Sequence, residues 1–204
     1  MKNWSTVAIT DFGSGSKVHA STTRTVRQIG KISGTTLKRA KLLYRLMRYF
    51  EVNTVLELGT SLGIGTYAMA LGSPKADITS IEGCPEISNV AKKQLDEFQI
   101  ENVTLKTGIF LEVIPTLTEP YCDLVFFDGH HDKQATLTYF EQLLPKTHND
   151  SVFIFDDIHW SKGMTEAWEC IKNHPQVTVT INTFYWGFVF FRTEQAKEHF
   201  VIRT

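Results

Sequence analysis

The sequence contains no apolar run approaching the roughly 20 residues that a membrane-spanning helix needs. Its first residues also lack the apolar core of a signal peptide. Among 204 residues there are only three cysteines, Cys84, Cys122 and Cys170, an odd number in apolar surroundings. Such cysteines are typical of reduced, packed thiols. We therefore expect no membrane association and a cytoplasmic location.

Lysine and arginine nowhere form a block dense enough to indicate nucleic-acid binding by itself. The net charge of −1 is nevertheless uneven, because residues 1–50 carry ten Lys or Arg and a single acid, whereas the remainder carries eleven and twenty-one. Such a split can mean an anionic partner for the N-terminal part, or docking of that part on the acidic body of its own or a sister subunit. We favour docking, which makes nucleic acid an unlikely partner and a homodimer possible.

The length of the chain suits one well-buried domain and is too short for two of ordinary size. Residues 1–35 are rich in Ser, Thr and Gly, with an evident flexible turn at residues 11–16. We interpret residues 1–35 as an arm or lid that could order over a substrate. From Thr36 the apolar spacing becomes helical, so residues 36–204 are predicted to form a single domain that begins with a helix.

The central motif is residues 53–65, Asn-Thr-Val-Leu-Glu-Leu-Gly-Thr-Ser-Leu-Gly-Ile-Gly. It reads as a strand, a glycine-rich turn and the start of a helix at about residue 66. The glycines let the backbone pass close to a ligand, and the helix start presents free N–H groups to it. The spacing differs from the G-x-G-x-x-G of dinucleotide-binding proteins, and Glu57 would repel a pyrophosphate. A cationic ligand suits this acid better.

A second acid, Glu82, closes the next predicted strand at residues 77–82, where its carboxylate could accept both hydroxyls of a ribose. An acid-x-Gly-x-x-x-Gly turn followed about 25 residues later by another acid resembles the class I S-adenosylmethionine (SAM)-dependent methyltransferases. The alternative is an α/β domain whose glycines serve only helix–strand packing. The resemblance implies that SAM is the cofactor and that its binding residues include Glu57, Gly59, Thr60, Ser61, Gly63, Glu82, Gly108 and Asp128.

Six β/α alternations followed by a terminal hairpin predict an α/β fold with a doubly wound, Rossmann-like sheet. Further strands are expected at residues 102–106, 122–127, 151–155, 176–182 and 184–192, and further helices at residues 85–98, 110–117, 134–144 and 162–173. The resemblance covers residues 50–192. It implies seven strands in the order 3-2-1-4-5-7-6, with only strand 7 antiparallel and helices on both faces.

Asp128, Asp156 and Asp157 follow neighbouring predicted strands, and an all-oxygen cluster suits Mg²⁺, Mn²⁺ or Ca²⁺. The chain here resembles the metal-dependent O-methyltransferases of the catechol and the sugar or macrolide types. That resemblance implies a divalent cation bound by Asp128, Asp156 and Asp157, with Asp in place of the usual Asn at the last position. The position of the catalytic base in these enzymes corresponds to His131, whose imidazole suits proton abstraction near neutral pH. Alternatively, Asp156 or Asp157 only caps the following helix or binds the SAM side of the pocket.

The sequence therefore predicts a SAM-dependent O-methyltransferase for a small hydroxylated acceptor, with His131 and Asp128 as catalytic residues. Two alternatives stay open, a nucleic-acid or protein methyltransferase and a non-catalytic SAM-binding domain. Aromatic residues near the same strand ends either form a wall for a flat acceptor or serve core packing and a dimer surface. They are Trp160, Phe184, Tyr185 and Trp186.

Overall fold

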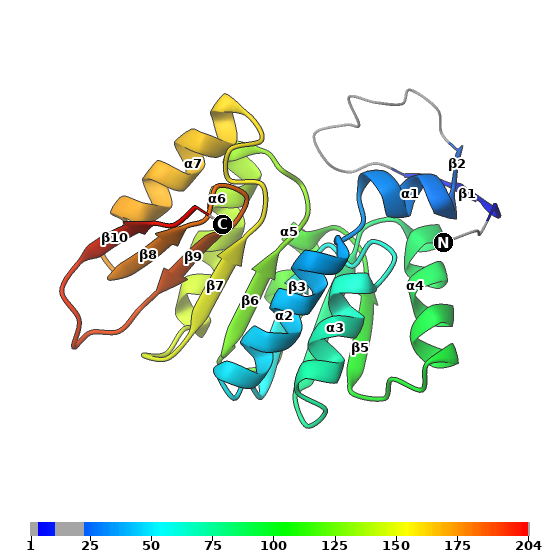
Figure 1. Ribbon diagram of the computed structural model, residues 1–204, viewed down its shortest axis with the longest axis horizontal. Helices are drawn as coiled ribbons and strands as arrows, with labels where there is room; N and C mark the ends of the chain where they lie inside the picture. Colours follow the sequence, from blue (N-terminus) through cyan, green and yellow to red (C-terminus); the bar gives the residue numbers. More distant parts are fainter. Residues whose placement is uncertain (1–3, 11–22, 204) are drawn as a thin grey trace.

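The computed structural model of the chain describes residues 4–10 and 23–203 (Figure 1). Within them, eight strands form the central sheet in the order β10-β8-β9-β7-β6-β3-β4-β5. Their bounds are β3 (Thr54–Leu58), β4 (Asp77–Glu82), β5 (Val103–Thr107), β6 (Leu124–Phe127), β7 (Val152–Phe155), β8 (Val179–Asn182), β9 (Gly187–Phe190) and β10 (Glu198–Val201). Strands β3 to β7 pair in parallel, and β9 is antiparallel to both of its neighbours.

The seven strands β3 to β9, numbered 1 to 7 along the chain, confirm the predicted order 3-2-1-4-5-7-6 with strand 7 antiparallel. The number of strands was wrong, because β10 adds an eighth strand that pairs in parallel with β8. The β8–β9 hairpin consequently does not form the edge of the sheet. All four residues of β10 are exposed, so the strand carries no alternation of apolar and polar residues that would reveal it in the sequence.

Helices cover both faces of the sheet (Figure 1), α2 and α3 on one and α6 and α7 on the other. The helix bounds are α1 (Val26–Ile32), α2 (Leu37–Tyr49), α3 (Ile64–Gly72), α4 (Pro85–Glu97), α5 (Phe110–Val113), α6 (Lys133–Leu143) and α7 (Lys162–Asn173). The predicted helices are confirmed to within a few residues. At residues 110–117 the helix is shorter than expected, and α5 continues as the 3₁₀ turn η1 (Ile114–Thr116). A second 3₁₀ turn, η2 (Leu144–Lys146), follows α6.

The core explains why the central strands are apolar throughout. In β6, Leu124 and Phe126 pack with the α2 and α3 side chains, whereas Val125 and Phe127 pack with those of α5, α6 and α7. Successive side chains of a strand point to opposite faces, so a sheet covered on both sides needs apolar residues at every position. This packing fixes the carboxyl ends of β6 and β7, where the predicted acids follow.

The described part of residues 1–35 contains strands β1 (Thr6–Ala8) and β2 (Thr23–Thr25) and helix α1. The two strands pair antiparallel, and Val7, Val26 and Ile29 form a small apolar cluster with Leu62. The expected turn at residues 11–16 lies outside the described residues. The division into an arm of residues 1–35 and a domain of residues 36–204 stays a prediction.

Two expectations from the composition can be compared with the structure. All three cysteines are free thiols, as expected, but only Cys84 and Cys122 are packed, because Cys170 is exposed on α7. Within residues 4–10 and 23–203, no helix has the length and apolar character needed to cross a membrane.

Candidate active site

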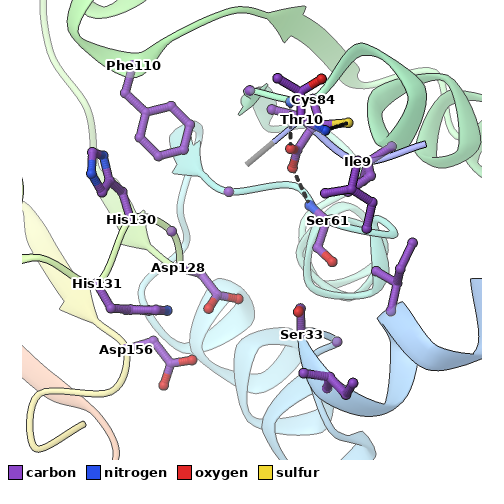
Figure 2. A pocket seen from close by; sticks show the side chains of 18 of the residues that line it. Ile9, Thr10, Ser33, Ser61, Cys84, Phe110, Asp128, His130, His131 and Asp156 are labelled. Carbon is purple, nitrogen blue, oxygen red and sulfur yellow. Dashed lines mark hydrogen bonds between the residues drawn. The ribbon is translucent and has the colours of Figure 1, made fainter. Parts of the chain in front are cut away.

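A cavity of about 330 Å³ lies at the carboxyl ends of β3, β4, β6 and β7 (Figure 2). This is where ligands bind in open α/β sheets. One wall comes from the residues that follow these strands, and we call it the strand-end wall. The opposite wall comes from the described residues of the N-terminal segment, and we call it the arm wall. The arm wall is formed by Ile9, Thr10, Arg24, Ile29, Ile32, Ser33, Gly34 and Thr35.

The glycine-rich turn after β3 brings the backbone close to the cavity. Gly59 has a φ of 107°, and a Cβ there would lie 2.3 Å from the carbonyl oxygen of Asp128. Gly59 and Ser61 line the cavity, as predicted for cofactor contacts. Thr60 and Gly63 do not, because Thr60 bonds to Ser80 beneath the surface and Gly63 begins α3 with a φ of 75°.

Glu82 faces the cavity at the end of β4, where the sequence places it. Its Oε2 accepts a hydrogen bond of 2.9 Å from the backbone N–H of Ser61, and its Oε1 accepts one of 3.0 Å from that of Cys84. Burial raises the pKa of Glu82, and these backbone bonds oppose the rise. Each carboxylate oxygen keeps a lone pair for a ligand hydroxyl. The side chain is thus a fixed acceptor for a hydroxylated group.

Glu57 lies behind the cavity rather than in its lining. Its Oε2 accepts hydrogen bonds from the hydroxyls of Thr66 and Ser80, and the residue is only 1% exposed. Burial raises the pKa of Glu57 to about 7, although both hydroxyls lower it. Glu57 therefore does not line the cavity, and its contact with the cofactor stays a prediction. The alternation of side chains along β3 explains this position, because Glu57 and Val55 both point to the face of the sheet that α2 and α3 cover.

Asp128 and Asp156 meet at the ends of β6 and β7, as predicted for neighbouring parallel strands. Figure 2 shows both carboxyl groups turned towards the cavity. Burial and the hydrogen-bonded carboxylate of Asp156 raise the pKa of Asp128 well above its usual range. Two carboxyl groups in contact cannot easily both ionise. The raised pKa favours the protonated form of Asp128 in this pair.

The sequence did not reveal the cation that these acids contact, which is the side chain of Arg39 on α2. Its Nη1 lies 3.0 Å from Asp156 Oδ2, and its Nη2 lies 3.6 Å from Asp157 Oδ1. No three His, Cys, Asp or Glu side chains within the described ranges are grouped so that they could hold a metal ion. Asp128, Asp156 and Asp157 therefore lie together as predicted, but their arrangement around Arg39 does not fit the expected divalent cation.

His131 lines the same wall, and Figure 2 shows its side chain beside those of Asp128 and Asp156. Burial and Asp156 raise the pKa of Asp157, and the interaction with His131 opposes this rise. The neighbouring His130 has a φ of 53° and bonds instead to the Tyr139 hydroxyl at 2.9 Å. His131 is thus the imidazole nearest the carboxyl groups of this wall.

The four aromatic residues of the sequence prediction divide between two environments. Trp160 lines the cavity and is 54% exposed, whereas Trp186 is buried in the core against Phe126. Phe184 and Tyr185 are exposed, and the Tyr185 ring lies 5.0 Å from the Arg39 guanidinium. Core packing therefore accounts for Trp186, and an acceptor wall stays a prediction for the other three.

A doubly wound sheet in this strand order, with a glycine-rich turn after its first central strand and a fixed acid after the next, has the architecture of class I SAM-dependent methyltransferases. Residues 56–158, half of the chain, match the family model described as a methyltransferase domain. The chain belongs to this methyltransferase domain family.

Individual proteins resemble the chain more distantly. The catechol O-methyltransferase of Niastella koreensis is 29% identical over 126 residues, which cover 59% of this chain and 56% of that protein. The chain thus spans little more than half the length of this curated relative.

Two solved structures share the fold. The O-methyltransferase TomG from Streptomyces achromogenes, in complex with SAM, has a TM-score of 0.71 at 21% identity, covering 82% of this chain and 87% of that one. The O-methyltransferase from Bacillus cereus, in complex with SAH, has a TM-score of 0.69 at 21% identity, covering 81% and 88%.

Proposed function

We propose that this chain is a SAM-dependent O-methyltransferase that acts on a hydroxyl group of a small acceptor. The observation that carries the proposal is that the strand-end wall of one cavity holds both a fixed hydroxyl acceptor, Glu82, and an acid–imidazole group, Asp128 and His131. The first suits the ribose of a nucleoside cofactor, and the second suits removal of a proton from an acceptor. Membership of the methyltransferase domain family supports the same conclusion.

SAM, when bound, supplies a methyl group on a positively charged sulfur. The cavity fits such a ligand, because Glu82, Asp156 and Asp157 make its lining rich in acids and Gly59 leaves room for close approach of the backbone. Glu82 would hold the ribose hydroxyls. The acidic strand-end wall would favour the cationic end of the ligand electrostatically.

His131 is proposed as the base that makes the acceptor hydroxyl nucleophilic. In the transfer, the acceptor oxygen bonds to the methyl carbon as the carbon–sulfur bond breaks, and the hydroxyl proton passes to the imidazole. The raised pKa of Asp128 favours its protonated form, which would donate a hydrogen bond rather than compete for that proton. Trp160 stands at the same wall and could pack against a flat acceptor. A catechol is the first acceptor to test, because one relative carries that activity in its name.

The divalent cation expected from the sequence is not included in this mechanism. Arg39 already places a positive charge against Asp156 and Asp157, and its Nη1 is within hydrogen-bond distance of Asp156. A guanidinium offers fixed donors in one plane and suits paired carboxylates. We therefore propose that Arg39 positions these acids and balances their charge, so that methyl transfer proceeds in the presence of a chelator.

Mn²⁺ binding by calorimetry tests this role independently of turnover. Wild-type protein should show no stoichiometric Mn²⁺ binding, whereas Arg39→Ala should gain it, because three carboxyl groups then lose their shared cation. Arg45→Ala, which removes an exposed arginine from the same helix, is the matched control and should behave as wild type. Stoichiometric Mn²⁺ binding by the wild type that is lost in Asp156→Asn would contradict the proposal.

The main experiment measures SAM and SAH binding by calorimetry, followed by transfer of labelled methyl groups to a panel of catechols and other small hydroxylated acceptors. Glu82→Gln should weaken SAH binding roughly 10- to 100-fold, the value of a charged hydrogen bond. Glu97→Gln, at an exposed position of α4, should not change it. SAM binding without turnover on any acceptor would favour a non-catalytic SAM-binding domain. Transfer to RNA, DNA or protein alone would favour a methyltransferase for macromolecules.

A further inference from the structure

Arg24 is a buried charge that lacks a complete set of partners. It stands at the centre of β2, is 8% exposed and lines the cavity from the arm wall. Its Nε is inaccessible to solvent and has no hydrogen-bond partner among the described residues. A buried donor on a charged group is costly when unsatisfied, so such a group in a cavity wall indicates a missing ligand.

Ser61 gives a second, independent observation on the same cavity. Its hydroxyl oxygen is also buried without a hydrogen-bond partner within the described ranges, although its backbone N–H is bound to Glu82. Figure 2 shows Ser61 at the cavity, with Asp128 on one side of it and Ile9 and Thr10 on the other. Two residues from distant parts of the chain therefore line one cavity, and each carries an unsatisfied donor.

The charges of the lining define the group that could satisfy these donors. Among the described lining residues, Arg24 is the only lysine or arginine, while Glu82, Asp128, Asp156 and Asp157 are all acids. A ligand suited to this cavity therefore carries positive charge that can lie near these acids and one anionic group that can lie at Arg24. SAM has this pattern, since its α-carboxylate is its single anionic group and lies at the opposite end from its adenine.

We propose that the Nε–H of Arg24 and the hydroxyl of Ser61 bind the α-carboxylate of SAM. This inference rests on the proposed function and adds that the arm completes the cofactor site. Arg24 is held in place because it pairs with Val7 in the β1–β2 ladder, and Val7 packs against Leu62, the residue next to Ser61. The arm is tied to the body again where the backbone N–H of Thr10 donates to Cys84 Sγ at 3.4 Å.

The test compares two ligands that differ by the carboxylate alone, SAH and its decarboxylated analogue S-adenosyl-3-thiopropylamine, by calorimetry. Wild-type protein should prefer SAH by roughly 10- to 100-fold, as expected for a charge-assisted hydrogen bond. Arg24→Met keeps the apolar stem and should abolish this preference by weakening SAH binding only. Ser61→Ala should reduce the preference by a smaller factor. Arg27→Met, at an exposed arginine two positions before Ile29, is the matched control and should keep it.

Several outcomes would overturn the inference. An unchanged preference for SAH in Arg24→Met would exclude the carboxylate contact. So would an equal loss of affinity for both ligands, provided that the circular dichroism and melting temperature of the variant match those of the wild type. If Arg24→Met does not fold, Arg24→Lys and Ser61→Ala provide the same comparison. Binding of SAH with no preference in the wild type would overturn this inference alone. Absence of SAH binding by the wild type would overturn the proposed function as well.

Discussion

The two walls of the cavity are built in different ways. The strand-end wall follows strands that are paired on both sides, and the N–H groups of Asp128 and Asp156 donate to carbonyls of the neighbouring strands at 2.9 Å. The arm wall rests on a ladder of three residue pairs and one apolar cluster. The comparison indicates that acid–base groups occupy the more rigid part of the molecule, whereas the cover of the site belongs to a segment of lower local stability.

The largest expected effect concerns His131 and tests whether the chemistry belongs to the strand-end wall. His131→Ala should lower kcat about 10²- to 10⁴-fold, the usual contribution of a general base. Because His131 is not proposed to hold the cofactor, SAH affinity should stay near that of wild type. The measurements are methyl-transfer kinetics on the acceptor found by the panel and calorimetry with SAH. His199→Ala, on the exposed β10, is the control. An equal fall in kcat and SAH affinity would contradict the assignment.

The next effect concerns Glu57, which lies behind the strand-end wall, and appears in the pH dependence of stability. Its pKa is about 7 in the folded protein against 4.5 for the ordinary group, so the folded state holds more protons between these values. Stability should therefore fall as pH rises from about 4.5 through 7, by of the order of 3 kcal/mol from this residue. Glu57→Gln should remove that part of the fall. Urea unfolding at pH 5 and pH 8 measures the free energy of unfolding of both proteins. An equal change in this free energy between the two pH values in wild type and Glu57→Gln would exclude the effect.

The smallest effect concerns the arm wall, where Ile29 is 2% exposed in the apolar cluster. Ile29→Ala should cost about 2 kcal/mol, near the lower end for a buried isoleucine, because a peripheral segment can relax. The loss should be local: hydrogen exchange should rise in α1 and SAH binding should weaken, with exchange in β6 and β7 unchanged. Lys31→Ala, at an exposed position of α1 that does not line the cavity, is the control. A uniform rise in exchange over the central sheet would show that the arm is not a separate unit of stability.

Much of the strand-end wall was predictable because its signals are local. A glycine-rich turn after an apolar strand indicates the position of Gly59. The acid Glu82 ends a strand, and Asp128 and Asp156 each follow one directly. Parallel strands deliver their carboxyl ends to one edge, so sequence order alone brings these groups together.

Other features depend on contacts that no local pattern records. Glu57 turns away from the cavity because hydroxyls from β4 and α3 satisfy its carboxylate, and their positions follow only from packing. Arg39 lies on α2, far from Asp156 in the sequence, and their pairing requires the folded sheet. Arg24 lies in a Ser- and Thr-rich segment without clear periodicity, so its burial could not be foreseen.

The ion pair between Arg39 and Asp156 also bears on biosynthesis, because its two residues are 117 positions apart in the sequence. At roughly 5–20 residues per second on the ribosome, Asp156 is added about 6 to 23 seconds after Arg39. During that interval the α2 guanidinium has no partner from β7, and the acids of that strand do not yet exist. The charge balance of the site can therefore form only after β7 and the residues that follow it have been made.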